Sequence, residues 1–479
     1  MAARLPSTAR LALAAAVVLG IAGCNLGPRY HTPSVPAPAS WDTPGVETVT
    51  TWPAAGWWQQ FNSRELDELI TQAQAANDDL AAAVSRVRLA DALVRVNSAP
   101  LLPSLDGTAS ATRQRMFLPL NGGTLTFDQY EAQLNASYQI DFWGKNLAAR
   151  AAALATAAAS RFDRATVELT VMSSVATTYF QVLELRDRVN IAHDNLASAQ
   201  VILKGLKAQQ AAGIANALDV AQQETTVATL DASIPPLEAQ LQQNLDALAI
   251  LIGKPPQGLD IAHGGLVAIE QPAVSPGMPS ELLARRPDVA QSEAQLVAAN
   301  ADIRQARAAF FPSIQLTANG GFASVALSSL LEPGSRIYDL AAGLTQPIFH
   351  GGALVGEYQF SKARYDELLA DYHKAVISAF GNVEDALAAT SRTAEQLARQ
   401  QVAVDKARRA YEFAQAQMRA GTVNILTVLN TETALFSAQD TLAQVKLAHL
   451  TALVDLFKAL GGGWERSMEN QQCAFPHCL

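Results

Sequence analysis

The sequence predicts a mixed α and β membrane protein, built from two copies of one structural unit, in which β-barrel strands continue into long α-helical coiled coils. Three patterns predict this fold class. The segment 209–220 is repeated at 417–428, so the chain is internally duplicated. Apolar residues recur every seven positions through two long segments, as in coiled coils. Shorter segments alternate between apolar and polar residues, as membrane-barrel strands do.

The first 23 residues match a bacterial export signal. Arg4 and Arg10 give a positively charged start, a short apolar run follows, and small residues precede Cys24. The apolar run is too short to cross a bilayer as a helix. Its end resembles a lipobox, which predicts that Cys24 is acylated, for example with palmitate, and becomes the first residue of a lipoprotein. The alternative is an ordinary signal peptide with a chance cysteine. By resemblance to lipoprotein sorting rules, Asn25 favours the outer membrane.

Composition excludes several classes of protein. The formal net charge is −9, and no basic stripe is present, which argues against nucleic acid as a partner. Apart from Cys24, the cysteines are Cys473 and Cys478 in the C-terminal tail, so no disulfide framework extends through the body of the protein. No two histidines have the spacing of metal ligands, and no glycine-rich phosphate loop is present. The sequence therefore predicts no enzyme, no cofactor and no metal site.

The duplication divides the chain into segments. Two repeats are separated by a proline-rich linker, preceded by an extended arm rich in proline and tryptophan, and followed by a short tail. The predicted segments are the signal 1–23, the arm 24–62, the first repeat 63–253, the linker 254–279, the second repeat 280–461 and the tail 462–479.

Each repeat is predicted to begin with one amphipathic helix, over 64–99 or 280–310. A pair of strands follows, and then a long heptad segment, 145–212 or 353–420. At about 1.5 Å per residue, each of these long helices spans roughly 100 Å. No single globular domain needs that length, whereas the gap between two bacterial membranes does.

The long helices are predicted to turn back on themselves. Gly213 and Gly421 follow them at the positions where a left-handed C-cap is expected. A second amphipathic helix follows each glycine, over 216–252 and 424–460. Each repeat therefore contains an antiparallel helical hairpin whose tip lies at the glycine.

The clearest predicted strand is 127–141. Tyr130 and Tyr138 belong to its apolar face, whereas Glu131 and Gln133 belong to its polar face, as expected for a barrel around an aqueous lumen. The alternative is an amphipathic strand of a soluble sandwich. The other predicted strands are 104–117, 313–325 and 336–348. Because about eight strands make the smallest filled barrel, the four strands of one chain require partners, and a trimer would give twelve.

Several short motifs together resemble the TolC-type outer-membrane efflux family, in the lipoprotein branch that includes OprM and NodT. These motifs are the lipobox, Gly27-Pro28-Arg29-Tyr30, Asp141-Phe142-Trp143-Gly144, Pro287-Asp288-Val289 and Ala420-Gly421-Thr422. The resemblance covers nearly all of 21–464. It implies a homotrimer with a 12-stranded β-barrel that continues into a periplasmic α-helical barrel. It also implies two partners, a periplasmic adaptor protein and an inner-membrane pump of the RND type.

The resemblance also places a gate at the hairpin tips, where three protomers would converge. In the family, a leucine, an aspartate and an arginine of the second tip close the pore. The matching residues here are Leu426, Asn430 and Thr433, so the leucine is kept and the charged pair is not. Leu426 is expected to form an apolar constriction that closes by dewetting. Asp219 and Glu432 are the nearby acids expected to compensate for the missing charges.

The leading interpretation is an outer-membrane channel of a tripartite efflux system, a passive, gated exit duct for drugs or other small solutes. A channel for type I protein secretion or heavy-metal export shares the same architecture. A periplasmic coiled-coil scaffold lipoprotein without a pore is the alternative from a different class, and the alternation at 127–141 argues against it.

Overall fold

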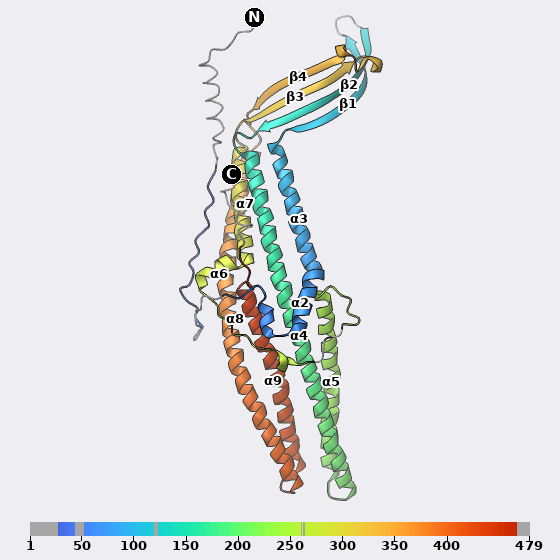
Figure 1. Ribbon diagram of the computed structural model, residues 1–479, viewed down its shortest axis with the longest axis vertical. Helices are drawn as coiled ribbons and strands as arrows, with labels where there is room; N and C mark the ends of the chain where they lie inside the picture. The colour runs from blue at the N-terminus through green and yellow to red at the C-terminus, as the bar shows by residue number, and fades with distance from the viewer. Residues whose placement is uncertain (1–26, 44–51, 119–122, 260, 262–263, 467–479) are drawn as a thin grey trace.

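The computed structural model describes residues 27–43, 52–118, 123–259, 261 and 264–466, so Cys24, Cys473 and Cys478 lie outside the described residues. Figure 1 shows an elongated molecule with a β-sheet at one end and two helical hairpins at the other. The main elements are α2 (Arg64–Ala76), α3 (Asp78–Ser98), β1 (Ser104–Leu118), β2 (Gly123–Ile140), α4 (Lys145–Ala211), α5 (Ala217–Leu251), α6 (Pro279–Arg285), α7 (Pro287–Ala308), β3 (Ser313–Ser324), β4 (Arg336–Thr345), α8 (Ala353–Arg419) and α9 (Ile425–Ala459).

The duplication predicted from the sequence is visible in the helices. Helices α4 and α8 contain 67 residues each, and α5 and α9 contain 35 residues each. Corresponding helices begin and end 208 positions apart. Each pair forms an antiparallel hairpin that extends away from the sheet (Figure 1). None of the described helices combines the length and the hydrophobicity that a membrane span requires.

The sequence predicted that each of the two shorter amphipathic helices is continuous. In the structure, each of them is broken. Asn77 lies between α2 and α3, where its side chain accepts a hydrogen bond from the Leu80 amide and donates one to the Leu251 carbonyl at 2.9 Å. Between α6 and α7 the break falls at Arg286, which precedes a proline and is extended (φ −108°, ψ 121°). The prediction of single helices was wrong because the bonds of Asn77 at the first break and the proline after Arg286 at the second override the apolar periodicity.

The predicted extended arm is also folded at its end. Trp57–Phe61 forms a 3₁₀-helix, η1, and both of these aromatic residues are fully buried. Trp57 stacks on Phe457 with ring centroids 5.1 Å apart, and Phe61 meets Phe180 edge-on at 5.1 Å. This cluster lies where α2, α4 and α9 meet, so the arm is part of the core that joins the two hairpins.

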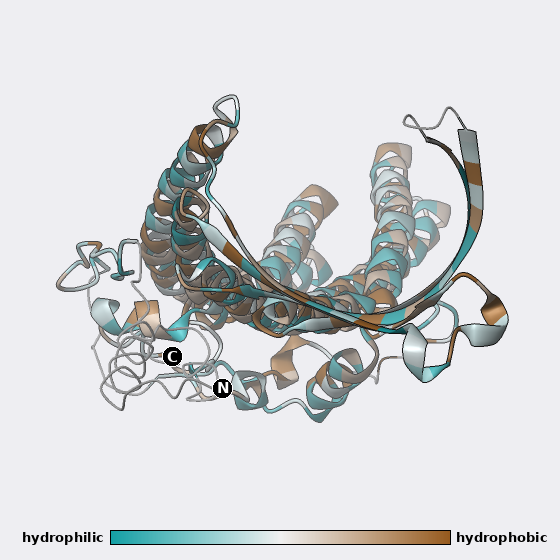
Figure 2. Ribbon diagram, turned by 90° about the horizontal axis from the view of Figure 1, so that it is seen from above, coloured by the Kyte–Doolittle hydropathy of each residue, from teal (hydrophilic) through white to brown (hydrophobic). Residues whose placement is uncertain are grey.

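The four strands form one antiparallel sheet in the order β1-β2-β3-β4. They coincide closely with the predicted strands, with two exceptions: β2 begins four residues earlier, at Gly123 rather than 127, and β4 ends three residues earlier, at Thr345 rather than 348. Seen from above, the sheet is strongly curved (Figure 2). Within the described residues, the two outer strands, β1 and β4, each have one neighbour, so one edge of each remains open there.

Candidate functional site

The two hairpin tips have the same backbone geometry. Gly213 and Gly421 have φ values of +75° and +72°, a left-handed conformation that favours glycine. At the second tip, the Gly421 amide donates to the Met418 carbonyl at 3.0 Å and the Thr422 amide donates to the Gln417 carbonyl at 3.0 Å. This pair of bonds is the Schellman arrangement that satisfies the last helical carbonyls. Each predicted cap residue therefore lies at a turn.

The three residues aligned with the family gate share one exposed face of α9. Leu426, Asn430 and Thr433 are spaced by four and three positions, and all three are exposed, with Leu426 at 47%. Their neighbours Ile425 and Val428 are buried in an apolar cluster between the hairpins. The apolar face of α9 is therefore used for packing within the chain, whereas Leu426 projects from the opposite, open face, where another protein surface can contact it.

The two acids expected to compensate for the missing charged pair are engaged elsewhere. Asp219 forms a capping box with Asn216, whose side chain accepts from the Asp219 amide at 2.9 Å. Glu432 lies two residues from Asn430, about 200° around the helix, and is fully buried. The structure therefore does not bring Asp219 or Glu432 together with Asn430.

Glu432 is unusual because its carboxyl group is buried between the two helices of the second hairpin. The Tyr411 hydroxyl of α8 donates to Glu432 Oε1 at 3.4 Å, and Oε2 is buried without a hydrogen-bond partner among the described residues. Burial raises the pKa of the Glu432 carboxyl to about 7, and the bond from Tyr411 opposes this only in part. Near neutral pH, this acid is therefore partly protonated in the folded protein.

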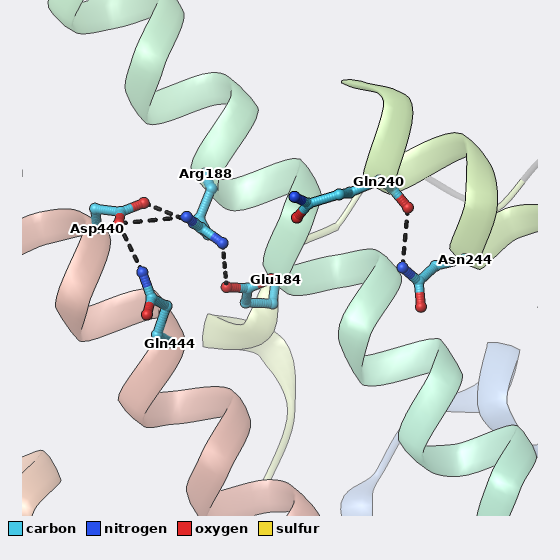
Figure 3. A network of polar contacts seen from close by, with 6 residues as sticks. All are labelled: Glu184, Arg188, Gln240, Asn244, Asp440 and Gln444. Carbon is cyan, nitrogen blue, oxygen red and sulfur yellow. Dashed lines mark hydrogen bonds and ion pairs between the residues drawn. The ribbon is translucent and has the colours of Figure 1, made fainter. Parts of the chain in front are cut away.

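A charged network between the hairpins is a site that the sequence did not reveal (Figure 3). The Arg188 guanidinium of α4 donates to both carboxylate oxygens of Asp440 on α9, with Nε–Oδ1 at 2.6 Å and Nη2–Oδ2 at 3.4 Å. Gln444 also donates to Asp440, at 2.7 Å, and Glu184 accepts from Arg188 at 3.4 Å. We call Glu184, Arg188, Asp440 and Gln444 the inter-hairpin clamp.

The clamp is shielded from solvent on the α4 side. The Glu184 side chain is 4% exposed and that of Arg188 is 20% exposed, whereas that of Asp440 is 38% exposed. Burial raises the pKa of the Glu184 carboxyl, and the charge of Arg188 opposes that shift. One guanidinium therefore compensates two carboxylates, one from each hairpin. In contrast, the bond from Asn244 to the Gln240 carbonyl, drawn beside the clamp, stays within α5.

The described part of the chain contains no group of three or more histidine, cysteine, aspartate or glutamate residues that could hold a metal ion. His449, one of the buried polar residues, contacts the Thr393 hydroxyl at 3.0 Å, and burial lowers the pKa of its imidazole. This histidine therefore belongs to the packing between α8 and α9.

This architecture defines a subunit of an outer-membrane channel, and comparison with known proteins agrees. A family model described as outer membrane efflux protein matches residues 69–254 and 278–462. These two segments together span most of the chain and correspond to its two repeats. The chain belongs to the outer membrane efflux protein family, and it is the outer-membrane channel component of an efflux system.

Individual relatives support this assignment over nearly the whole chain. The chain is 41% identical to the pyoverdine export outer membrane protein OpmQ of Pseudomonas aeruginosa, over 95% of this chain and 96% of OpmQ. It is 34% identical to the toluene efflux pump outer membrane protein TtgF of Pseudomonas putida, over 95% of this chain and 97% of TtgF. Among solved structures, it resembles the outer-membrane channel OprN, with a TM-score of 0.87 and 26% identity over 92% of this chain and all of that chain.

The inter-hairpin clamp generates a first prediction. Changing Arg188 to Gln leaves two carboxylates facing each other without a cation, so we expect a loss of about 1–2 kcal/mol of stability, discounted for the partial exposure of Asp440. The measurement is the free energy of unfolding of Arg188→Gln, Asp440→Asn and the double variant. A coupling energy near zero between the two changes would contradict the clamp. Arg64→Gln, in an exposed pair within α2, is the control and should change little.

A second prediction concerns the pH dependence conferred by Glu432. The pKa of its carboxyl is raised on folding, so its favourable contribution is complete below about pH 4.5 and is lost as the pH rises toward 7, by at most about 3 kcal/mol. Glu432→Gln should therefore be more stable than the wild type at pH 8 and similar to it near pH 4.5, in thermal unfolding at both pH values. Glu412→Gln, at an exposed position of α8, is the control. An equal effect of Glu432→Gln at both pH values would refute the assignment.

Proposed function

We propose that three copies of this chain close into a ring that forms the gated exit duct of a tripartite efflux system. The observation that carries this proposal is the pair of open sheet edges. Strands alternate in direction from β1 to β4, so β4 of one copy can pair antiparallel with β1 of the next. Two copies would give about eight strands, whose interior fills with side chains, whereas three give twelve and leave a lumen.

The helices below the sheet have open sides at the same two ends. Contacts run from α3 to α4, from α4 to α7 and from α7 to α8, so α3 and α8 are the outermost helices of this layer. Helix α3 exposes Leu89, Leu93 and Val96, spaced by four and three positions, and α8 exposes Phe360 and Ile377. Apolar stripes of this kind mark interfaces. We infer that α8 of one copy packs on α3 of the next.

In the ring, the exposed face of α9 would turn toward the axis at the tips. Three Leu426 side chains would then form an apolar constriction, with Asn430 and Thr433 on the same face behind it. Such a constriction excludes water and closes a pore without charged pairs. The engagement of Asp219 and Glu432 elsewhere supports an apolar closure.

We propose that a periplasmic adaptor and an inner-membrane pump of the RND type deliver the cargo to this duct. The hairpins carry exposed apolar side chains at the first tip, Ile214 at 77% and Leu218 at 63%, as a contact surface for a partner. For the cargo, an exported siderophore is the first to test, because two relatives, at 41% and 39% identity, are named as pyoverdine export proteins. Loss of siderophore secretion on deletion of this chain would support that cargo, and unchanged secretion would exclude it.

We also propose that Cys24 carries a lipid anchor in the inner leaflet of the outer membrane. The described arm begins at the membrane-proximal end of α7, where Asn300 donates to the Pro28 carbonyl at 3.3 Å and the stem of Arg304 lies against Gly27. Three residues of chain reach at most about 10 Å. This short reach would keep an acyl group on Cys24 at the end of the helices that adjoins the sheet.

The ring generates a third prediction. The protein extracted in detergent should be a trimer, because each copy leaves two sheet edges unsatisfied. Native mass measurement gives the stoichiometry directly. A stable monomer with unchanged circular dichroism would overturn the shared barrel, and a dimer would leave no aqueous lumen.

A fourth prediction compares two tip residues. Leu426→Ser should raise the resting conductance in planar bilayers and the uptake of large antibiotics, because it places a hydroxyl in the apolar constriction. Asn430→Ala should do less, since it removes only solvent-competed hydrogen bonds of about 1 kcal/mol each. The reverse order of effects would show that the closure is polar. Absence of conductance in both the wild type and Leu426→Ser would mean a scaffold and not a duct.

A fifth prediction concerns the anchor. Cys24→Ser should abolish labelling by radioactive palmitate and slow maturation, while some protein still reaches the outer membrane through the barrel. Equal labelling of the wild type and the variant would end the lipoprotein assignment.

A further inference from the structure

The two faces of the sheet differ in charge as well as in polarity. On one face, the residues that pair across the strands are apolar. Ile140 of β2 pairs with Ile314 of β3, which pairs in turn with Leu344 of β4. The next pairs on this face are Tyr138 with Leu316 and Ala136 with Ala318. The opposite face carries Asn135 and Asn319, flanked by acids on both outer strands. This is the polar face, which is expected to line an aqueous lumen.

The charged residues of the four strands segregate between these faces. By the pairing of the strands, all three arginines lie on the apolar face, and three of the four acids lie on the polar face. The arginines are Arg113, Arg115 and Arg336; the acids of the polar face are Asp106, Glu131 and Asp339; Asp128 is the one acid of the apolar face. Arginines on a lipid-facing side cost free energy unless they meet an anionic partner there.

The height of the arginines along the strands identifies that partner. The apolar face extends from Ile140 to Tyr130, ten residues that rise about 33 Å along the strand and about 25 Å when tilted as in a barrel. That rise matches the apolar band of an outer-membrane barrel. Arg113 and Arg115 occupy the next two positions of β1 on this face beyond Tyr130, at the end farthest from the helices. Arg336 begins β4 at the same end, one position inside the band.

The arginine side chains are accessible to lipid headgroups. The Arg113 side chain is 76% exposed and lies 3.6 Å from Asp128, its one acidic neighbour. Arg115 donates to the Thr124 hydroxyl at 3.3 and 3.2 Å, which orients the guanidinium without neutralising it. Among the described residues, no carboxylate lies within ion-pair distance of Arg115 or Arg336. This end of the apolar face therefore carries an excess of positive charge.

We propose that Arg113, Arg115 and Arg336 form a basic girdle that binds the phosphate groups of phosphorylated glycolipid in the outer leaflet of the outer membrane. A guanidinium offers two parallel donors to one phosphate, and this geometry suits a headgroup held at a fixed depth. The girdle fixes the height of the barrel in the membrane and rests on the outer-membrane location, not on the identity of the cargo.

The test uses the full-length protein purified in detergent, with a bisphosphorylated lipid A and its dephosphorylated form as probes in native mass spectrometry. The wild type should bind the bisphosphorylated lipid about tenfold more tightly than the dephosphorylated form. The triple variant Arg113→Gln, Arg115→Gln, Arg336→Gln should lose this preference. A matched triple variant of exposed arginines on the helices, Arg64→Gln, Arg392→Gln, Arg399→Gln, should keep it.

Further arms separate the girdle from a purely structural role. Asp128→Asn removes the competing carboxylate, so lipid binding should increase; a fall in stability with no increase in lipid binding would mean that Arg113 serves only the hairpin. Replacement of the three arginines by lysine should restore part of the preference for the bisphosphorylated lipid. This variant therefore shows whether the glutamine variant loses the preference because it misfolds. Equal binding of both lipid forms by the wild type, or retention of the preference by the triple glutamine variant, would overturn the proposal. The same spectra report the subunit count, so failure of the proposed ring is seen separately.

Discussion

The unpaired backbone of the two outer strands is the constraint on which the rest of this molecule depends. A strand edge within a bilayer has no water to satisfy its amide and carbonyl groups, and only closure satisfies them. Because β1 and β4 leave such edges at opposite sides of one curved sheet, the interface must be heterologous and must close on itself. The exposed apolar residues of α3 and α8 lie below those same edges. The contact of one copy with the next thus completes both the sheet and the layer of helices below it.

The aromatic core around Trp57 and Phe457 connects this upper part to the hairpins. Its residues come from η1, α2, α4 and α9, so it joins the arm to both repeats. Below the core, the two hairpins touch mainly through α4 and α9, and the inter-hairpin clamp adds a charged link between these helices. The Arg188–Asp440 pair lies on the tip side of the aromatic core, so hairpins that separate from their tips would break this pair before they disturb the core.

The sequence predicts well whatever depends on local pattern and fails where distant residues meet. Heptads and the glycines Gly213 and Gly421 predicted the hairpins to within one residue at each helix end, because periodicity and left-handed caps are local properties. The break at Asn77 was missed, since its side chain bonds to Leu251, 174 positions away. Arg188 and Asp440 are 252 positions apart in helices rich in charge, so no spacing distinguishes this pair from solvated ones.

The position of the acids explains how a tip that lacks the family's charged pair can still close. Asp219 lies at the first tip, where its carboxylate completes the capping box of α5 and accepts a hydrogen bond from the Asn216 backbone amide. Glu432 faces Tyr411 inside the second hairpin, and its partly protonated carboxyl gives no fixed charge at the tip. Neither acid therefore stands beside Asn430 and Thr433 as a replacement for the missing charges. What remains on the open face is Leu426 with two neutral polar residues, and an apolar ring needs no counter-charge to exclude water. The proposed closure by Leu426 therefore requires no unpaired buried charge at the tip.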